Sequence, residues 1–211
     1  MPVTALENES LPPGPYPLFE KWHRAAEAQA GIPYAGAMTL STVSADGFPE
    51  GRVVLLHAAE AGRGFAFLTD ARSRKGRALA KVPRAALTFY WGPLERQVRV
   101  QGRVACASSA TADRFFARRP RRSRAVAWAA TQSRPLPSGP ATDALKERVA
   151  ALDERFSERA TIPRPPYWQA YWVRPRCVAF WEAKARRLHT RVRYDRDEKS
   201  SAGWRVCRPA P

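Results

Sequence analysis

The feature that most constrains this fold is a series of short segments in which apolar residues alternate with polar or small ones. A repeat of two is typical of strands that bury one face, and Asp46-Gly47 between two such segments favours a tight hairpin turn. Strands are expected at residues 38–42, 52–57, 65–69, 85–91, 96–107, 168–173, 177–181, 192–195 and 204–208. Their order predicts a mainly β, α+β fold, in which an antiparallel sheet closes into a barrel with helices packed outside it.

Two of these segments carry further information. Residues 52–57 (RVVLLH) are apolar enough for a buried strand, and Gly102 inside the longest segment predicts a β-bulge. Helical spacing begins at Leu18, after a proline-rich stretch at 1–17 that we expect to be an extended arm, so that 18–211 forms a single domain. Further helices are expected at 73–82, 109–118, 123–130 and 143–159.

Charge is the second constraint. The 211 residues include 36 Lys and Arg, only six of them Lys, against 19 Asp and Glu, for a formal net charge of +17. Arginine binds planar or tetrahedral anions through a fork of N–H groups, so an anionic partner is expected: a phosphate ligand, nucleic acid or a membrane surface. A solvated basic surface accounts for the charge equally well. Because 45% of the residues are hydrophobic, a disordered tail is excluded.

The Cys and His residues are too scattered along the chain to form a disulfide scaffold or a metal site. Three Cys with no close pair exclude a disulfide scaffold and a zinc motif, and free thiols fit a reducing compartment. The N-terminal residues are acidic and proline-rich, unlike a signal peptide, and no apolar run is long enough to cross a bilayer. We therefore expect a cytoplasmic protein.

Three basic segments are candidate anion sites. Arg52 leads an apolar strand, where a guanidinium needs an anion or a carboxylate partner. Ser73-Arg74-Lys75 starts a helix whose unpaired N–H groups favour phosphate, although a basic helix start is more often plain surface. Five Arg lie between 118 and 124 and repel one another unless an anion bridges them; a solvated basic turn is the alternative.

Other polar residues complete the set of candidates. A repeat of two places Arg187, His189 and Arg191 on one face of a strand, which suits an acid–base or anion site. Gln97, on an inward face, would be a buried amide that holds a ligand or a core network. No segment is typical of a Ser or Cys nucleophile, a Gly-rich nucleotide loop or a carboxylate pair. These groups suit a phosphorylated aromatic cofactor better than unaided acid–base chemistry.

Several motifs together resemble one family. They are RVVLLH at 52–57, SRKG at 73–76, LTFYWGPLERQVRVQGRV at 87–104, FFARRPRRS at 115–123, RLHTR at 187–191 and GWRVCRPAP at 203–211. Their order and spacing are similar to those of the pyridoxine/pyridoxamine 5′-phosphate oxidases over nearly the whole chain. The resemblance implies an FMN-binding split β-barrel, a homodimer with two FMN sites built from both subunits, hydride transfer from substrate to flavin, and reoxidation by O2 to hydrogen peroxide.

The resemblance also implies a role for individual residues. Those that would bind FMN are Arg52, Val53, Val54, Leu55, Leu68, Thr69, Arg74, Lys75, Gln97, Gln132, Ser133, Trp181 and Arg191. Those at the position of the substrate are His57, Phe115, Arg119, Ser123, Arg187 and His189, of which Arg187 and His189 lie over the substrate ring as the catalytic pair.

The chain departs from the family pattern where the substrate's phosphate binds. His57 replaces a Lys and Phe115 replaces a Tyr, and Leu68 replaces an aromatic residue beside FMN. Histidine is at most partly charged at neutral pH, and a phenyl ring offers no hydrogen bond. The loss of two phosphate ligands would cost a few kcal/mol, at about 1.5–3 kcal/mol for each charge-assisted bond. The pattern therefore predicts a retained flavin site and an eroded substrate-phosphate site.

Three functions are consistent with these residues, and a fourth is considered but not expected. The first is a divergent oxidase of secondary metabolism, similar to the phenazine-pathway oxidases that act on larger, non-phosphorylated rings. The second is an oxidase that makes pyridoxal 5′-phosphate, with the Arg residues of 118–124 as compensation. A non-catalytic flavin or haem binder is the third. A nucleic-acid-binding module is the fourth and is not expected, because the basic residues are spread along the chain rather than clustered in one stripe.

Overall fold

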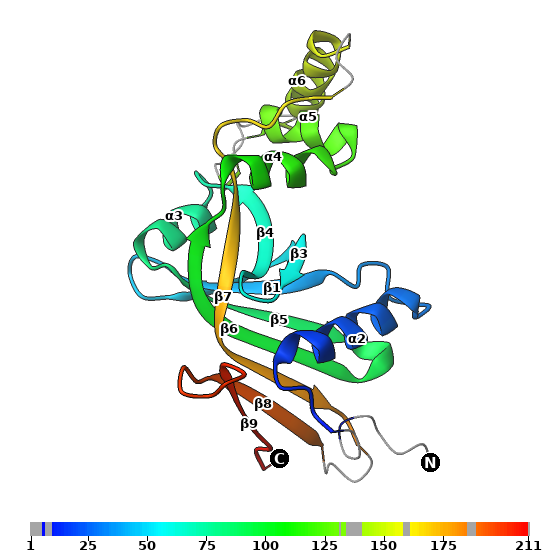
Figure 1. The fold of residues 1–211 in the computed structure, drawn as a ribbon. Helices are drawn as coiled ribbons and strands as arrows, with labels where there is room; N and C mark the ends of the chain where they lie inside the picture. Colours follow the sequence, from blue (N-terminus) through cyan, green and yellow to red (C-terminus); the bar gives the residue numbers. More distant parts are fainter. Residues whose placement is uncertain are drawn as a thin grey trace.

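The computed structural model describes residues 6, 10–130, 132–133, 141–157, 161–184 and 189–210, without the side chains of 141, 142 and 144. Within these ranges one antiparallel sheet runs in the order β2-β1-β5-β6-β7-β4-β3, and β8 and β9 extend it from β7 (Figure 1). The strands are β1 (Ala37–Val43), β2 (Pro49–Leu55), β3 (Ala58–Glu60), β4 (Gly64–Asp70), β5 (Arg84–Trp91), β6 (Arg96–Cys106), β7 (Trp168–Glu182), β8 (Thr190–Arg196) and β9 (Trp204–Cys207). The helices are α2 (Pro15–Ala28), α3 (Arg74–Lys81), α4 (Ser109–Ala117), α5 (Arg121–Ala129) and α6 (Ala141–Arg155), with a 3-10 turn η1 (Gly92–Leu94).

The sheet curls into a split barrel, and β7 is the strand that splits it. It runs without interruption where two strands were expected, at 168–173 and 177–181. The register against β6 shifts at Gly102, so Arg176 is the extra residue of the expected bulge. A Cβ at Gly102 would lie 2.1 Å from the carbonyl oxygen of Arg174, which explains the glycine. Before the bulge β7 pairs with β4, and beyond it β7 pairs with β8.

Helix α2 closes the barrel over an aromatic core. The Phe19 ring lies 4.9 Å from that of Phe65 and 5.1 Å from that of Phe89, and the Trp22 ring lies 5.3 Å from that of Phe180. The helix begins at Pro15, earlier than expected, because proline is well suited to the first turn of a helix. The last residues of the expected arm are therefore helical.

Strand β2 lies at an edge of the sheet and is not the buried strand that its apolar sequence predicts. Its residues are alternately half-buried and exposed, and the outward-facing Val53 and Leu55 are 69% and 50% exposed. Just beyond the strand, the His57 N–H donates to the carbonyl oxygen of Ala66 in β4 at 2.8 Å. The chain after β2 thus reaches across to the other end of the sheet.

The remaining helices lie at one end of the barrel. Figure 1 shows α4, α5 and α6 stacked beyond β4 and the start of β7, while β8 and β9 lie at the opposite end. Phe116 of α4 packs against Trp168, with ring centroids 6.0 Å apart, and Trp128 of α5 packs against Phe156, which follows α6, at 5.9 Å. Among the helices described, none is long and apolar enough to cross a membrane.

Candidate functional site

A cavity of about 450 Å³ opens where β2 meets the start of α3. It is lined by Glu50, Gly51, Arg52, Arg74, Lys75 and Ser133. Ser73 caps α3 as expected, because its side chain accepts the Gly76 N–H at 3.2 Å. The Arg74 N–H donates to Ser133 Oγ at 3.2 Å, and Lys75 Nζ donates to Gln132 Oε1 at 2.9 Å. The fold therefore brings together five of the residues expected at FMN, including Arg52, in what we call the anion cavity.

Glu50 is the acidic residue among those that line the anion cavity. Its Oε2 accepts from Arg52 Nη2 at 2.9 Å, and its Oε1 accepts from Arg74 Nη2. Arg52 also donates to the Leu40 carbonyl at 3.0 Å and to Thr42 Oγ1 at 2.8 Å. The carboxylate partner expected for Arg52 is thus present, two residues away on the same face of β2.

Burial of cations gives the anion cavity its electrostatic character. Burial lowers the pKa of Arg52, and the neighbouring Glu50 carboxylate opposes that shift. Burial also lowers the pKa of Lys75, with the charge of Arg52 acting in the same direction and that of Asp70 against it. Because the pKa values of both cations are lowered despite the nearby carboxylates, their charge is not fully compensated, and the cavity is suited to bind a further anionic group.

A second group of expected site residues lies on the outer face of the sheet. Tyr90, Gln97, Trp181 and Arg191 are register partners across β5, β6, β7 and β8. Gln97 is half-buried on this outer face, whereas its neighbour Val98 points into the core. The expectation of an inward-facing Gln97 was therefore wrong, because the pleat of β6 places the valines inside.

His189 belongs to this second group. Strand β8 begins at Thr190, so His189 precedes the strand instead of lying in it as expected. Its ring lies 5.0 Å from that of Trp181, and its Nδ1 accepts the Lys184 N–H at 3.3 Å. In the neutral imidazole the proton then lies on Nε2, which can donate to a ligand. Arg187, the expected companion of His189, lies outside the described residues.

A third group contains the residues expected at the substrate's phosphate. The rings of His57 and Phe115 are stacked, with centroids 5.3 Å apart and an interplanar angle of 20°. The Arg119 guanidinium lies 4.1 Å above the ring of Trp168, and its Nη2 donates to the carbonyl oxygen of Ser123 at 3.3 Å. The structure brings all four expected residues into one region.

The electrostatics of this third group are unlike those of the anion cavity. Burial, followed by the charges of Arg119 and Arg118, lowers the pKa of His57 to about 4. At neutral pH its imidazole is uncharged, and Phe115, 1% exposed, presents only a phenyl ring. Two of the four side chains in this region therefore lack the charge or hydroxyl that a phosphate would require.

Two further cofactor candidates, Leu68 and Thr69, belong to the wall of the barrel. They are 8% and 2% exposed and lie in β4, where they pair with Ala170 and Gln169 of β7. Thr69 is the last residue but one of β4, which ends at Asp70 before the turn that leads into α3. Their side chains are buried within this chain.

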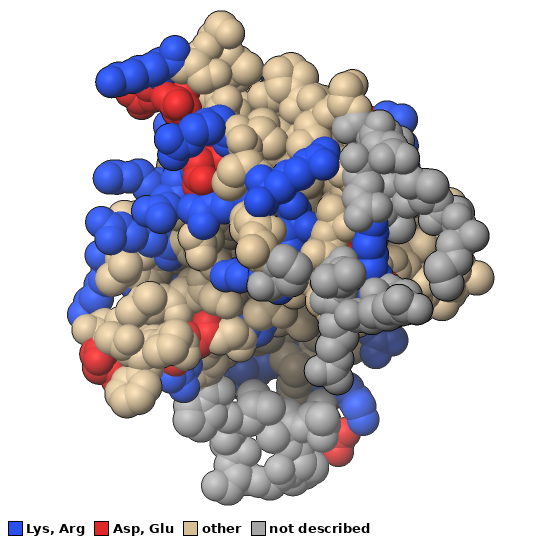
Figure 2. Space-filling view, turned by 90° about the horizontal axis from the view of Figure 1, so that it is seen from below, with Lys and Arg blue, Asp and Glu red and all other residues tan. Residues whose placement is uncertain are grey.

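The arginine cluster at 118–124 is partly explained by packing. Arg121 Nη2 donates to the carbonyl oxygen of Phe156 at 3.0 Å, and Arg124 is 9% exposed. The bridging anion considered for the whole cluster is therefore not needed for Arg121, whereas the buried Nε of Arg124 has no hydrogen-bond partner among the described residues. Other basic residues remain on the surface, and in Figure 2 Lys and Arg visibly outnumber Asp and Glu on the face shown.

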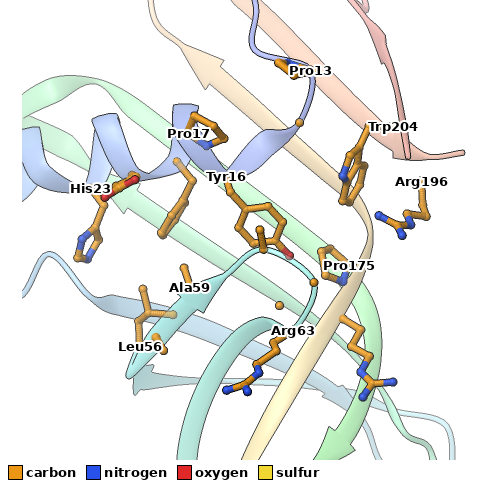
Figure 3. Close-up of a pocket in the computed structure, with 18 of the residues that line it drawn as sticks. Pro13, Tyr16, Pro17, His23, Leu56, Ala59, Arg63, Pro175, Arg196 and Trp204 are labelled. Carbon is orange, nitrogen blue, oxygen red and sulfur yellow. The ribbon is translucent and has the colours of Figure 1, made fainter. Parts of the chain in front are cut away.

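A larger cavity adjoins the third group at His57. It has a volume of about 1210 Å³ and lies between α2, the β3–β4 turn, β7 and the segment that leads into β9. Figure 3 shows Tyr16 projecting into it, with Arg196 and Trp204 to one side and His23 to the other. Among the expected site residues that the structure describes, His57 alone lines this cavity.

Two residues were not identified from the sequence. Glu50 follows from the repeat of two, which places it beside Arg52 on one face of a strand, so that signal was available. Trp168, under Arg119, had no local signal, because 48 residues separate the two in the chain.

Comparison with known families covers most of the chain. The family described as pyridoxamine 5′-phosphate oxidase matches residues 25–152, and the pyridoxine 5′-phosphate oxidase C-terminal dimerisation region matches residues 168–211. Pyridoxine/pyridoxamine 5′-phosphate oxidases of Burkholderia vietnamiensis and Burkholderia pseudomallei are 42% and 43% identical over 207 residues, which span 98% of this chain and 94% of each relative.

Solved structures agree with the fold. PhzG of Burkholderia lata, determined in complex with tetrahydrophenazine-1-carboxylic acid, has a TM-score of 0.87 at 29% identity and covers 99% of this chain and 98% of its own. A pyridoxamine 5′-phosphate oxidase-related, FMN-binding protein of Nostoc punctiforme has a TM-score of 0.73 at 18% identity, over 96% of this chain and 100% of its own. Together with the two matches that cover residues 25–152 and 168–211, this likeness establishes that the chain belongs to the pyridoxamine 5′-phosphate oxidase family.

Proposed function

We propose that this protein is an FMN-dependent oxidase. The donors of the anion cavity fit the phosphate of a flavin mononucleotide: two guanidiniums, an ammonium, a hydroxyl and the N–H groups that begin α3. Arg52, Arg74 and Lys75 would hold that phosphate, with Gln132 and Ser133 fixing its neighbours. Bound FMN would supply a hydride acceptor for the substrate, and O2 would reoxidise it, taking up two electrons and two protons to leave as hydrogen peroxide.

We also propose that the active protein is a homodimer. Within one chain the anion cavity lies at β2 and the start of α3, whereas Gln97, Trp181 and Arg191 of the second group lie on β6, β7 and β8, and Figure 1 shows α3 well away from β8. The second group shares its outer face with exposed apolar side chains, Leu55 and Tyr90, the kind of surface that another subunit covers. A second copy that covers this face would supply the second group to the first copy's cavity.

The substrate that best fits the third group is a ring that needs no tightly held phosphate. One observation carries this proposal: His57 is half-buried, uncharged at neutral pH and stacked on the buried ring of Phe115. This apolar pair suits a larger or non-phosphorylated ring, and the likeness to PhzG with a bound tetrahydrophenazine carboxylic acid supports the same class. Arg119, held over Trp168, remains available for a carboxylate.

His189 and Arg187 are the residues proposed to act on the substrate ring. The Nδ1 atom of His189 is occupied by the Lys184 N–H, so Nε2 is left to donate to a ring heteroatom or carboxylate. The neighbouring Trp181 ring limits the orientations of the imidazole. His189 therefore orients the substrate through one defined hydrogen bond.

We also propose a cytoplasmic location. The exposed Cys106 and Cys207 thiols are consistent with it.

Pyridoxal 5′-phosphate synthesis is the second candidate, and the relatives favour it. Proteins that are 42% and 43% identical over 98% of this chain carry that activity in their names. Arg119 and Ser123 lie together as this activity would require. Under this alternative Arg119, and Arg118 next to it, compensate for the missing charge at His57.

Substrate turnover distinguishes the two candidates. The FMN-loaded enzyme is supplied in air with pyridoxamine 5′-phosphate or a partly reduced phenazine carboxylic acid, and peroxide and product are measured. We expect the His57→Lys, Phe115→Tyr variant to raise kcat/KM for the phosphorylated substrate about tenfold or more, the value of one charge-assisted bond, without raising it for the carboxylic acid.

Controls separate the other outcomes. Because Phe115 is buried, the single variant His57→Lys is measured alongside, with melting temperatures for all proteins. High wild-type turnover of pyridoxamine 5′-phosphate that the double variant does not improve would establish the second candidate. A protein that takes up flavin but releases no peroxide with either substrate would be a non-catalytic binder, and one that takes up no flavin would refute the cofactor.

A further inference from the structure

We propose that Glu50 competes with the phosphate of the cofactor for Arg52 and Arg74, and thereby weakens the affinity of this chain for FMN. The proposal rests on the proposed FMN site. It assigns to Glu50 a role in setting cofactor affinity, and it predicts that removal of the carboxylate improves binding.

The geometry places this carboxylate where the phosphate has to bind. Glu50 lines the anion cavity and contacts both guanidiniums, with one oxygen on each. Its side chain is 18% exposed, against 68% for Arg74, so it lies within the cavity while Arg74 extends to the surface. An incoming phosphate needs the same N–H groups that Glu50 already occupies.

The other anchors of the cavity do not depend on Glu50. Arg52 is also held by the Leu40 carbonyl and Thr42 Oγ1, and Lys75 by Gln132 Oε1 at 2.9 Å and Ser73 Oγ at 3.3 Å. Two of the three cations therefore keep their positions when the carboxylate is removed. Only Arg74, which is largely exposed, would lose its side-chain contact with Glu50.

Charge then determines the sign of the effect. A phosphate monoester carries between −1.5 and −2 charges at about pH 7. If Glu50 stays, it repels this group at close range; if it moves away, two charge-assisted hydrogen bonds must first be broken. Both routes reduce the affinity for FMN, and neither affects a flavin that lacks the phosphate.

The test measures flavin binding to the full-length apo-protein by fluorescence quenching. Glu50→Gln keeps the shape and removes the charge, and Glu50→Ala removes the side chain without adding a hydrogen-bond donor. Riboflavin has the same ring as FMN without the phosphate. Glu20→Gln is the matched control, because it removes the same charge from an exposed pair with Arg24 on α2.

We expect both Glu50 variants to bind FMN about tenfold more tightly than the wild type, with riboflavin binding and the Glu20→Gln control unchanged. Weaker FMN binding in either Glu50 variant would mean that Glu50 positions the arginines, and equal binding would mean that it has no effect; each result overturns the proposal. If the wild type binds neither flavin, the proposed function fails first, and the role of Glu50 fails with it.

Discussion

The anion cavity and the His57–Phe115 region are both partly buried and both rich in arginine, yet they treat charge in opposite ways. In the cavity, Glu50 lies between Arg52 and Arg74 and keeps buried charge partly compensated. Around His57 burial, followed by the charges of Arg119 and Arg118, lowers the pKa of the imidazole to about 4, and the ring is uncharged at neutral pH. Arginine content alone therefore says little about a site, because a carboxylate within reach determines whether buried cations persist.

The largest effect on FMN binding is expected at the proposed interface between the two subunits. Leu55→Asp places a charge on the exposed apolar face of β2 and should convert the dimer to monomers, with FMN affinity reduced more than about a hundredfold, because the second group is then missing and Leu55 is itself one of the residues expected at FMN. Light scattering with size-exclusion chromatography measures the mass. Val126→Asp, on an exposed apolar position of α5, is the control and should leave the dimer intact. A Leu55→Asp dimer would contradict the proposed interface.

The second prediction separates the two regions directly. Arg74→Ala with Lys75→Ala should weaken FMN binding about a hundredfold, since two charge-assisted contacts at about 1.5 kcal/mol each are lost. His57→Gln should change FMN affinity by no more than about twofold. Titration of the apo-protein with FMN gives both values, and Lys81→Ala at the other end of α3 is the control. If His57→Gln lost as much FMN affinity as the Arg74→Ala, Lys75→Ala variant, the two regions would not be functionally separate.

The smallest effect is on stability and follows from the pKa of about 4 for His57. The unfolded histidine binds a proton near pH 6.5, whereas the folded one resists it, so acidification favours unfolding. The wild type should lose about 2 kcal/mol of unfolding free energy between pH 6.5 and pH 4 through this residue, and nothing above pH 7. Urea unfolding of the wild type and His57→Gln at several pH values measures it. Parallel pH dependences in the two proteins would contradict the lowered pKa.

Local sequence was sufficient for much of the fold. The Asp46-Gly47 hairpin, the Ser73 cap and the Gly102 bulge were predicted correctly, because turn, cap and bulge preferences depend on neighbouring residues. The predictions that β2 is buried and that β7 is two separate strands were wrong, and β3 was not predicted at all. Each depends on which strand lies alongside, and an apolar run reads the same at the edge of a sheet as at its centre.

The candidate site divides in the same way. The basic start of α3 was evident in the sequence, and so were the two departures from the family, His57 and Phe115. That Lys75 meets Gln132, 57 residues further along the chain, was implied only by the resemblance and not by any local pattern. The outward face of Gln97 was available from the alternation along β6, because Val98 and Val100 are buried on the opposite face.

The sequence by itself therefore determined the family, the strand and turn pattern and the identity of the substituted residues. The tertiary structure decided what those residues do: it half-buried His57 near two arginines, placed Glu50 between two others, and put the second group on an outer face. The reason is physical. Residue identity sets which charges and hydrogen bonds are available, while burial and distance, which fix the strength of every electrostatic interaction, arise only when segments far apart in the chain pack together.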